Sequence, residues 1–179
     1  MAKLFSMLAV VACFAAVACT AKAPATTTLH GEGFAIYLTA QNVPVSQMPA
    51  LSHVDIAEKP FLSLSDIASY EWNTHDIKLT SFAMERLRAL QVPTSGTSFV
   101  VCVDRQPLYW GAFWVAFSSQ SFYGITIMKP LSAQEDIIQV ERGYPSPSFY
   151  RGEDPRNDPR IMESLKASGK LLLPTLDTR

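Results

Sequence analysis

Histidines, serines and one cysteine are the side chains of this chain that could act as bases or nucleophiles. His30, His53 and His75 lie far apart in the sequence and match no spacing of zinc ligands. No serine stands in the G-x-S-x-G turn that exposes a hydrolase nucleophile. Cys102 lies between valines with no histidine near it in sequence, which favours a buried, inert thiol. We therefore predict no catalytic residue and a protein that is not an enzyme.

Carboxylates gather near the C-terminal end of the chain. Glu153, Asp154 and Asp158 could supply oxygen ligands to calcium, but they lack the spacing of an EF-hand and its central glycine. A turn at Asp154-Pro155 and a helix cap by Asp158 account for two of the three without a metal. We accordingly expect neither a metal ion nor a cofactor.

Aromatic side chains are concentrated in one stretch and are the candidate ligand-binding residues. They are Tyr109, Trp110, Phe113, Trp114, Phe117, Phe122 and Tyr123, of which the first four are the predicted site. Aromatic faces could form a stacking platform for a sugar or an apolar ligand. The same residues could instead fill the core of a sheet, because aromatic rings pack well across strands. The density of apolar neighbours favours the core, and both interpretations stay open.

The stretch from Ser98 to Met128 must position these residues. Its apolar side chains, read at a period of two residues, fit β-strands. It predicts three strands joined by turns at Asp104–Pro107 and Ser118–Ser121. The strands are 99–103, 108–117 and 122–128. We expect the third strand to run antiparallel to the second. Gly111 suits a bulge or a close approach of two backbones.

The remaining segments predict further strands and two capped helices. Strands are expected at 34–39, 54–58 and 76–80, with 137–140 as a strand or short helix and 69–74 as a connection. Thr80 would cap a helix at 81–91, and Asp158 would cap a helix at 159–168 that stops at Gly169. The fold class is therefore α+β. We expect a mostly antiparallel sheet of about five strands, with one helix on a face and a second helix carried by a C-terminal arm.

The first residues have the features of an export signal. Lys3 precedes an apolar run from Leu4 to Val17, which is too short to span a bilayer and suits a secretory signal peptide. The small residues before Cys19 resemble a bacterial lipobox, in which the cysteine is lipidated; a freely secreted product stays open. Thr20 in place of an aspartate favours the outer membrane, facing the periplasm, if the cell has one. We expect a bacterial lipoprotein of the cell envelope.

Composition and boundaries agree with an exported single domain. The net charge of −1 over 179 residues does not suggest a nucleic-acid partner. The expected divisions are a signal peptide (1–18), a flexible tether (19–33), a globular domain (34–141) and a C-terminal arm with its helix (142–179).

One part of the chain resembles the first periplasmic head subdomain of the SecD/SecDF protein-export family. The resemblance is carried by Ser65-Asp66-Ile67, Ile77-Lys78-Leu79-Thr80, Arg86-Leu87, the Gly96–Asp104 strand and Gly111-Ala112. It covers about a third of the chain. It implies a small α+β unit that works outside the cytoplasm by contacting other polypeptides. It implies no catalytic residue and no translocation activity.

Taken together, these features favour an exported, lipid-anchored protein of the binding or assembly type that contacts envelope polypeptides. The first alternative is a binder of a small sugar or apolar ligand, using Tyr109, Trp110, Phe113 and Trp114. The second is a hydrolase whose site has no sequence motif. A buried pair of polar residues with shifted pKa values, lying in a cleft, would support the hydrolase.

Overall fold

The computed structural model describes residues 31–173, which form eight strands and two α-helices. The strands are β1 (Phe34–Leu38), β2 (Ile67–Glu71), β3 (Asp76–Leu79), β4 (Thr97–Val103), β5 (Gln106–Trp114), β6 (Phe122–Met128), β7 (Ile137–Tyr144) and β8 (Leu171–Leu172). The helices are α1 (Ser81–Ala89) and α2 (Pro159–Ala167). The proposed signal peptide and the lipidation site Cys19 lie outside the described residues.

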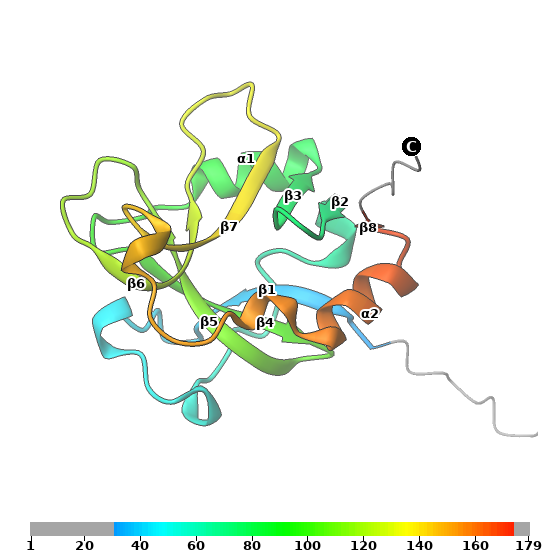
Figure 1. Ribbon diagram of the computed structural model, residues 1–179, viewed down its shortest axis with the longest axis horizontal. Helices are drawn as coiled ribbons and strands as arrows, with labels where there is room; N and C mark the ends of the chain where they lie inside the picture. The colour runs from blue at the N-terminus through cyan, green and yellow to red at the C-terminus, as the bar shows by residue number, and fades with distance from the viewer. Residues whose placement is uncertain (1–30, 174–179) are drawn as a thin grey trace, which may run out of the picture.

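The strands form one mixed sheet in the order β1-β4-β5-β6-β7-β3-β2-β8 (Figure 1). The pairs β5–β6 and β2–β8 are parallel, and the other pairs are antiparallel. The predicted α+β class is therefore confirmed. The expected number of about five strands is wrong, and so is the antiparallel orientation of β5 and β6.

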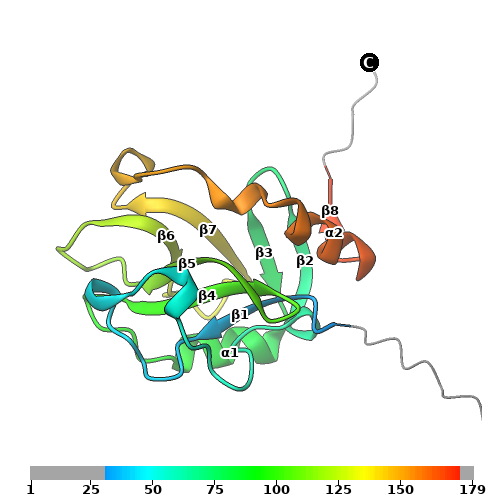
Figure 2. The ribbon, with the colours of Figure 1, turned by 90° about the horizontal axis from the view of Figure 1, so that it is seen from below.

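The sheet curls strongly around its own core. β1 and β2 stand far apart in the strand order, yet Phe34 of β1 and Tyr70 of β2 contact each other with ring centroids 6.0 Å apart. Figure 2 shows the result, in which β1 has come round to the side where β2 lies. The free edge of β1 also bonds to the segment before the 3₁₀ turn at Leu64–Asp66, since Ile36 N donates to Leu62 O at 2.8 Å.

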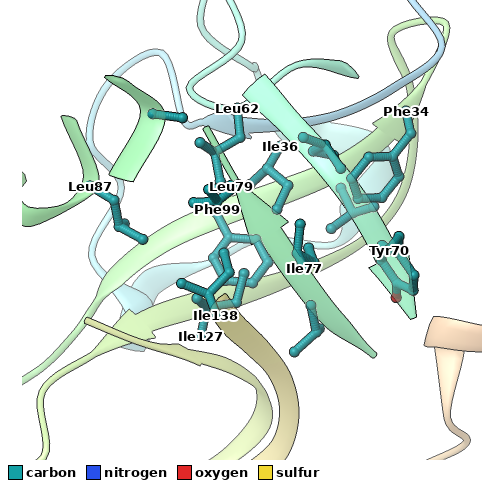
Figure 3. Close-up of a cluster of buried hydrophobic side chains, with 14 of the residues drawn as sticks. Phe34, Ile36, Leu62, Tyr70, Ile77, Leu79, Leu87, Phe99, Ile127 and Ile138 are labelled. Carbon is teal, nitrogen blue, oxygen red and sulfur yellow. The ribbon is translucent and has the colours of Figure 1, made fainter. Parts of the chain in front are cut away.

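The core lies inside this curl and draws on nearly every element. Figure 3 shows apolar side chains from β1, β2, β3, β4, β6, β7 and α1 pointing toward one another. A smaller cluster on the outer face of β1 and β4 contains Tyr37 and Cys102 and is covered by residues 48–56. Cys102 is buried there, as predicted, and burial raises the pKa of its thiol to about 12.

The two helices close the curl at different places, and both begin at the predicted caps. The Thr80 side chain accepts a hydrogen bond from Ala83 N, and that of Asp158 accepts one from Arg160 N. α1 adds Ala83, Met84 and Leu87 to the core. α2 lies beside β8 and the start of β1 in both ribbon views, and its Ile161 and Leu165 belong to the same core. Within residues 31–173, no helix is long and apolar enough to cross a membrane.

Three local predictions are corrected by the structure. Residues 69–74, expected as a connection, contain most of β2 and its turn. Residues 54–58 make a single bridge, Thr39 to Ile56, in place of a strand. β5 ends at Trp114, so the predicted turn at 118–121 is the polar part of a longer connection, and β6 pairs with the second half of β5 in the same direction.

Candidate functional site

β5 and β6 pair over only half of their length, and this creates the candidate site. The parallel register joins Gly111–Trp114 to Ile125–Met128. A Cβ atom at Gly111 would lie 2.4 Å from the carbonyl oxygen of Ile125, so the predicted close approach at this glycine is confirmed. In the described structure, the register shows no pairing between Gln106–Trp110 and β6. The two strands therefore diverge on the N-terminal side of Gly111.

The space at this divergence is a groove of about 360 Å³, which we call the aromatic groove. Its residues are Trp110 from β5, Phe122–Ile125 from β6, and Tyr150, Arg151 and Pro155 from the segment between β7 and α2. We call that last segment, residues 145–158, the β7–α2 segment. Three separate parts of the chain thus supply the walls, and most of the side chains are aromatic.

Ring contacts hold the walls of the aromatic groove in place. The ring of Phe122 stacks on Trp114 with centroids 5.3 Å apart, and it tilts against Trp110 at 5.8 Å. Tyr123 is 49% exposed, and the guanidinium of Arg151 lies 5.4 Å above its ring. The backbone N–H of Arg151 donates to the carbonyl of Tyr123 at 3.0 Å. This bond fixes the β7–α2 segment to β6.

The four residues predicted as a ligand platform do not share a surface. Tyr109 and Phe113 point into the core, where both are buried. Trp114 is 2% exposed and lies behind Phe122. Trp110 alone lines the aromatic groove. The alternation of the strand explains the split, because residues an odd number apart point to opposite faces.

A second group of polar residues packs against the inner face of the sheet and was not predicted. The Tyr70 hydroxyl and His75 Nδ1 are 3.0 Å apart, and His75 is 4% exposed with a left-handed φ of 57°. Arg156 donates from Nη1 to the carbonyl of Val140 at 2.7 Å, and from Nε and Nη2 to Asp154 at 2.8 and 2.6 Å. We call Tyr70, His75, Asp154 and Arg156 the anchoring cluster.

Burial and charge set the protonation of the anchoring cluster. Burial, followed by the positive charge of Arg156, lowers the pKa of His75 to about 4. Burial also raises the pKa of the Tyr70 hydroxyl. Hydrogen bonds from Arg156 lower the pKa of Asp154. At neutral pH the imidazole is neutral, and Asp154 and Arg156 are a charged pair that holds the β7–α2 segment on β7.

The remaining chemical candidates have structural roles or lie elsewhere. His53 belongs to a 3₁₀ turn at Leu51–His53 and lines a different pocket, while His30 lies outside the described residues. Asp154 and Asp158 accept hydrogen bonds from the backbone of Arg156 and Arg160, as their turn and cap predictions require. In the part of the chain that the structure describes, no group of three or more histidine, cysteine or acidic residues could hold a metal ion.

Sequence reasoning identified the turn at Asp154 and the cap at Asp158, but it did not place the β7–α2 segment beside the groove or bring the anchoring cluster together. Phe122 and Tyr123 belong to the aromatic stretch and were visible there. Tyr150 and Arg151 stand in a polar, proline-containing segment, and no sequence pattern links them to Trp110. Comparison of the chain with protein-family models, with curated proteins and with solved structures finds no match.

Proposed function

We propose that this protein is an exported, lipid-anchored and non-enzymatic binding protein of the bacterial cell envelope, and that it contacts other polypeptides through the aromatic groove. Export and anchoring rest on the N-terminal run and on Cys19. The resemblance of residues 62–127 to the SecD head subdomain points to the same kind of partner.

One observation carries the choice of the groove. Partly exposed aromatic rings line a cavity that adjoins the half of β5 that is not paired with β6. A strand with an open edge offers backbone N–H and C=O groups to an extended peptide, while neighbouring pockets receive its side chains. Aromatic and arginine side chains are also the residue types enriched in protein interfaces.

The first experiment separates anchoring from secretion. Intact mass spectrometry of the membrane fraction should find a mature chain that begins with a diacylated or triacylated Cys19. The substitution Cys19→Ser should remove the lipid mass and release the protein from that fraction. An unchanged mass and unchanged anchoring in the variant would contradict the lipoprotein proposal.

The second experiment tests the groove in cells. A photo-crosslinking amino acid placed at Tyr123 should yield discrete adducts with exported polypeptides, identified by mass spectrometry. The same group at Phe82, an exposed aromatic residue on α1 outside the groove, is the matched control. Equal adducts at both positions, or none at Tyr123, would remove the groove from the proposal.

A small sugar or apolar compound is the second candidate ligand for the same groove. Its volume of about 360 Å³ is within the range of small-molecule sites. Binding would change the fluorescence of Trp110, and Trp110→Phe would abolish that change. A panel of sugars and apolar compounds that leaves the emission unchanged would exclude this candidate.

The hydrolase alternative is supported by only part of the evidence that it requires. Tyr70 and His75 are a buried pair with shifted pKa values. Neither residue lines the aromatic groove or three other pockets of the described structure. Neither side chain is hydrogen-bonded to a serine or cysteine in residues 31–173. We therefore assign the pair to the anchoring cluster.

A further inference from the structure

The aromatic groove has a single charged side chain, and its charge is positive. Of the residues that line it, only Arg151 is ionised at neutral pH. Seven arginines lie in residues 31–173, and five of them are within 4.0 Å of a carboxylate oxygen in the described structure. The two others are Arg88 and Arg151. A cation without a carboxylate partner in an otherwise apolar groove favours an anionic ligand.

The guanidinium of Arg151 is held in place and keeps donors available. Its Nη1 donates to the carbonyls of Ser148 and Tyr150, each at 3.1 Å. The face of the guanidinium lies over the Tyr123 ring. Among the described residues, Nη2 and Nε make no hydrogen bond to protein. A fixed guanidinium with two free donors on one edge is suited to a carboxylate, which it binds through two parallel bonds.

The shape of the groove favours binding of the end of a partner polypeptide over binding of an internal segment. The bond from Arg151 N to Tyr123 O joins the wall formed by the β7–α2 segment to the wall formed by β6. A volume of about 360 Å³ is near the lower limit of the 300–1,000 Å³ typical of ligand sites. The open edge of β5 at Gln106–Trp110 can pair with the residues that precede a chain end. The aromatic walls suit an aromatic terminal side chain, because ring pairs add stabilisation beyond buried area.

We propose that the aromatic groove binds the C-terminal residue of an extracytoplasmic polypeptide, an aromatic residue whose α-carboxylate pairs with the guanidinium of Arg151. This inference rests on the proposed function and specifies its partner. The contact between the α-carboxylate and Arg151 would orient the bound peptide. The terminal aromatic side chain would pack against the rings of Trp110 and Tyr150. The peptide backbone would form hydrogen bonds with β5.

The test uses the full chain and synthetic peptides, with affinity measured by calorimetry and by tryptophan fluorescence. An eight-residue peptide ending in phenylalanine with a free carboxylate should bind. Its C-terminal amide and its analogue ending in alanine should each bind at least tenfold more weakly, which corresponds to about 1.4 kcal/mol. Raised salt should weaken the carboxylate peptide more than the amide.

Variants separate the contact from general effects on folding. Arg151→Gln should reduce the affinity for the carboxylate peptide to that of the amide, while the amide binds as before. Arg88→Gln is the matched control, since Arg88 also lacks a carboxylate partner but donates to carbonyls of Ser132, Ala133 and Glu135. Circular dichroism of both variants checks that each is folded.

The outcomes distinguish the inference from the proposed function. Equal binding of amide and carboxylate would overturn the inference, while crosslinks at Tyr123 in cells would leave the proposed function standing. N-acetylphenylalanine binding as tightly as the peptide would show that a free aromatic acid is the ligand and overturn the polypeptide assignment. If the peptides do not bind and Tyr123 forms no adduct, both proposals fail.

Discussion

His75 combines three constraints in one side chain. Its backbone is left-handed, its imidazole is buried, and the Tyr70 hydroxyl lies 3.0 Å from Nδ1. The imidazole faces Tyr70 of β2, Asp76 of β3, Arg142 of β7, and Asp154 and Arg156 of the β7–α2 segment. Protonation would place a third positive charge beside Arg142 and Arg156, and this charge would be only partly offset by the two aspartates.

We predict that His75 makes the protein less stable in mild acid. The unfolded histidine has a pKa near 6.5 and the folded one a pKa of about 4, so the unfolded state binds the extra proton between these values. Stability therefore falls as the pH drops from 6.5 to 4, by about 3 kcal/mol at most. Urea unfolding at pH 7, 5.5 and 4 measures the loss.

The variant His75→Asn should remove that dependence. Asparagine tolerates a left-handed φ, and its side-chain oxygen can accept from Tyr70. The pKa values of Asp66 and Asp154 are lowered, so the stability they contribute is lost only as the pH falls below about 3.8, outside the window. An unchanged slope between pH 6.5 and 4 in the variant would assign the acid sensitivity to another group.

Replacement by alanine should reduce stability by different amounts at Gly111 of β5 and at Gly124 of β6. In Gly111→Ala the new Cβ would meet the backbone oxygen of Ile125 at 2.4 Å, and a backbone cannot move aside without breaking the β5–β6 pair. In Gly124→Ala it would meet the end of the Phe122 ring at 2.5 Å, which can rotate away. We expect a loss of about 2–4 kcal/mol for Gly111→Ala and clearly less for Gly124→Ala. Equal losses in thermal unfolding would contradict this explanation.

At the scale of elements, a partly buried ion pair helps to hold the β7–α2 segment on β7. Asp154–Arg156 and Asp158–Arg160 have the same spacing, with closest distances of 2.6 Å in both. The Arg156 side chain is 11% exposed and that of Arg160 is 57% exposed. Only Arg156 also bonds to the carbonyl of Val140. The first pair should therefore hold the segment, and the second should contribute little.

We predict that Arg156→Gln opens the segment without unfolding the sheet. Losing a charge-assisted bond costs about 1.5–3 kcal/mol, which raises the population of the open segment roughly tenfold to a hundredfold. Trypsin should then cleave after Arg151 faster by a similar factor. Arg160→Gln is the matched control and should leave the cleavage rate unchanged. Equal acceleration in both variants would show that the pair does not anchor the segment.

At this scale, the sequence predicted those helices and strands that are determined by neighbouring residues, and it failed where the structure depends on distant parts of the chain. Caps at Thr80 and Asp158 and the alternation around Val101 are local, and α1, α2, β4 and β6 were predicted close to their true bounds. β2 was missed because its tyrosine, Tyr70, stands among polar residues. β6 runs parallel to β5, and the sequence of the connection between them does not specify that direction.

The candidate site was only partly predictable for the same reason. The aromatic stretch correctly indicated Trp110, Phe122 and Tyr123. Alternation alone could not tell which face of β5 the core would take. Tyr150 and Arg151 reach the groove only because β7 returns beside β6 and the following segment crosses Tyr123.

At the scale of the whole molecule, the curled sheet is completed by its last helix. α2 supplies Ile161 and Leu165 to the core, and β8 pairs with β2 directly after it. Removing a buried leucine or isoleucine side chain typically costs about 2–5 kcal/mol, and a small domain has only about 5–15 kcal/mol in total.

We therefore predict that a chain ending at Asp158 does not unfold cooperatively, whereas a chain ending at Leu173 unfolds like the full protein. Differential scanning calorimetry and near-ultraviolet circular dichroism report the difference. The single substitution Leu165→Ala should lower stability by about 2–5 kcal/mol. A cooperative transition in the shorter chain, at the temperature of the full protein, would show that α2 is an accessory to a sheet that is stable alone.

The bond between Phe34 N and Ser164 Oγ, 2.7 Å long, spans 130 positions of the chain. It ties the first strand to the last helix, so the order of synthesis matters. A polypeptide that emerges with its N-terminus first cannot complete its core until nearly all of it has emerged. Loops that close over such distances form late in folding. If the protein is exported as we propose, this delay would keep the chain in an extended state that can pass through a membrane channel, and the chain would fold only on the far side.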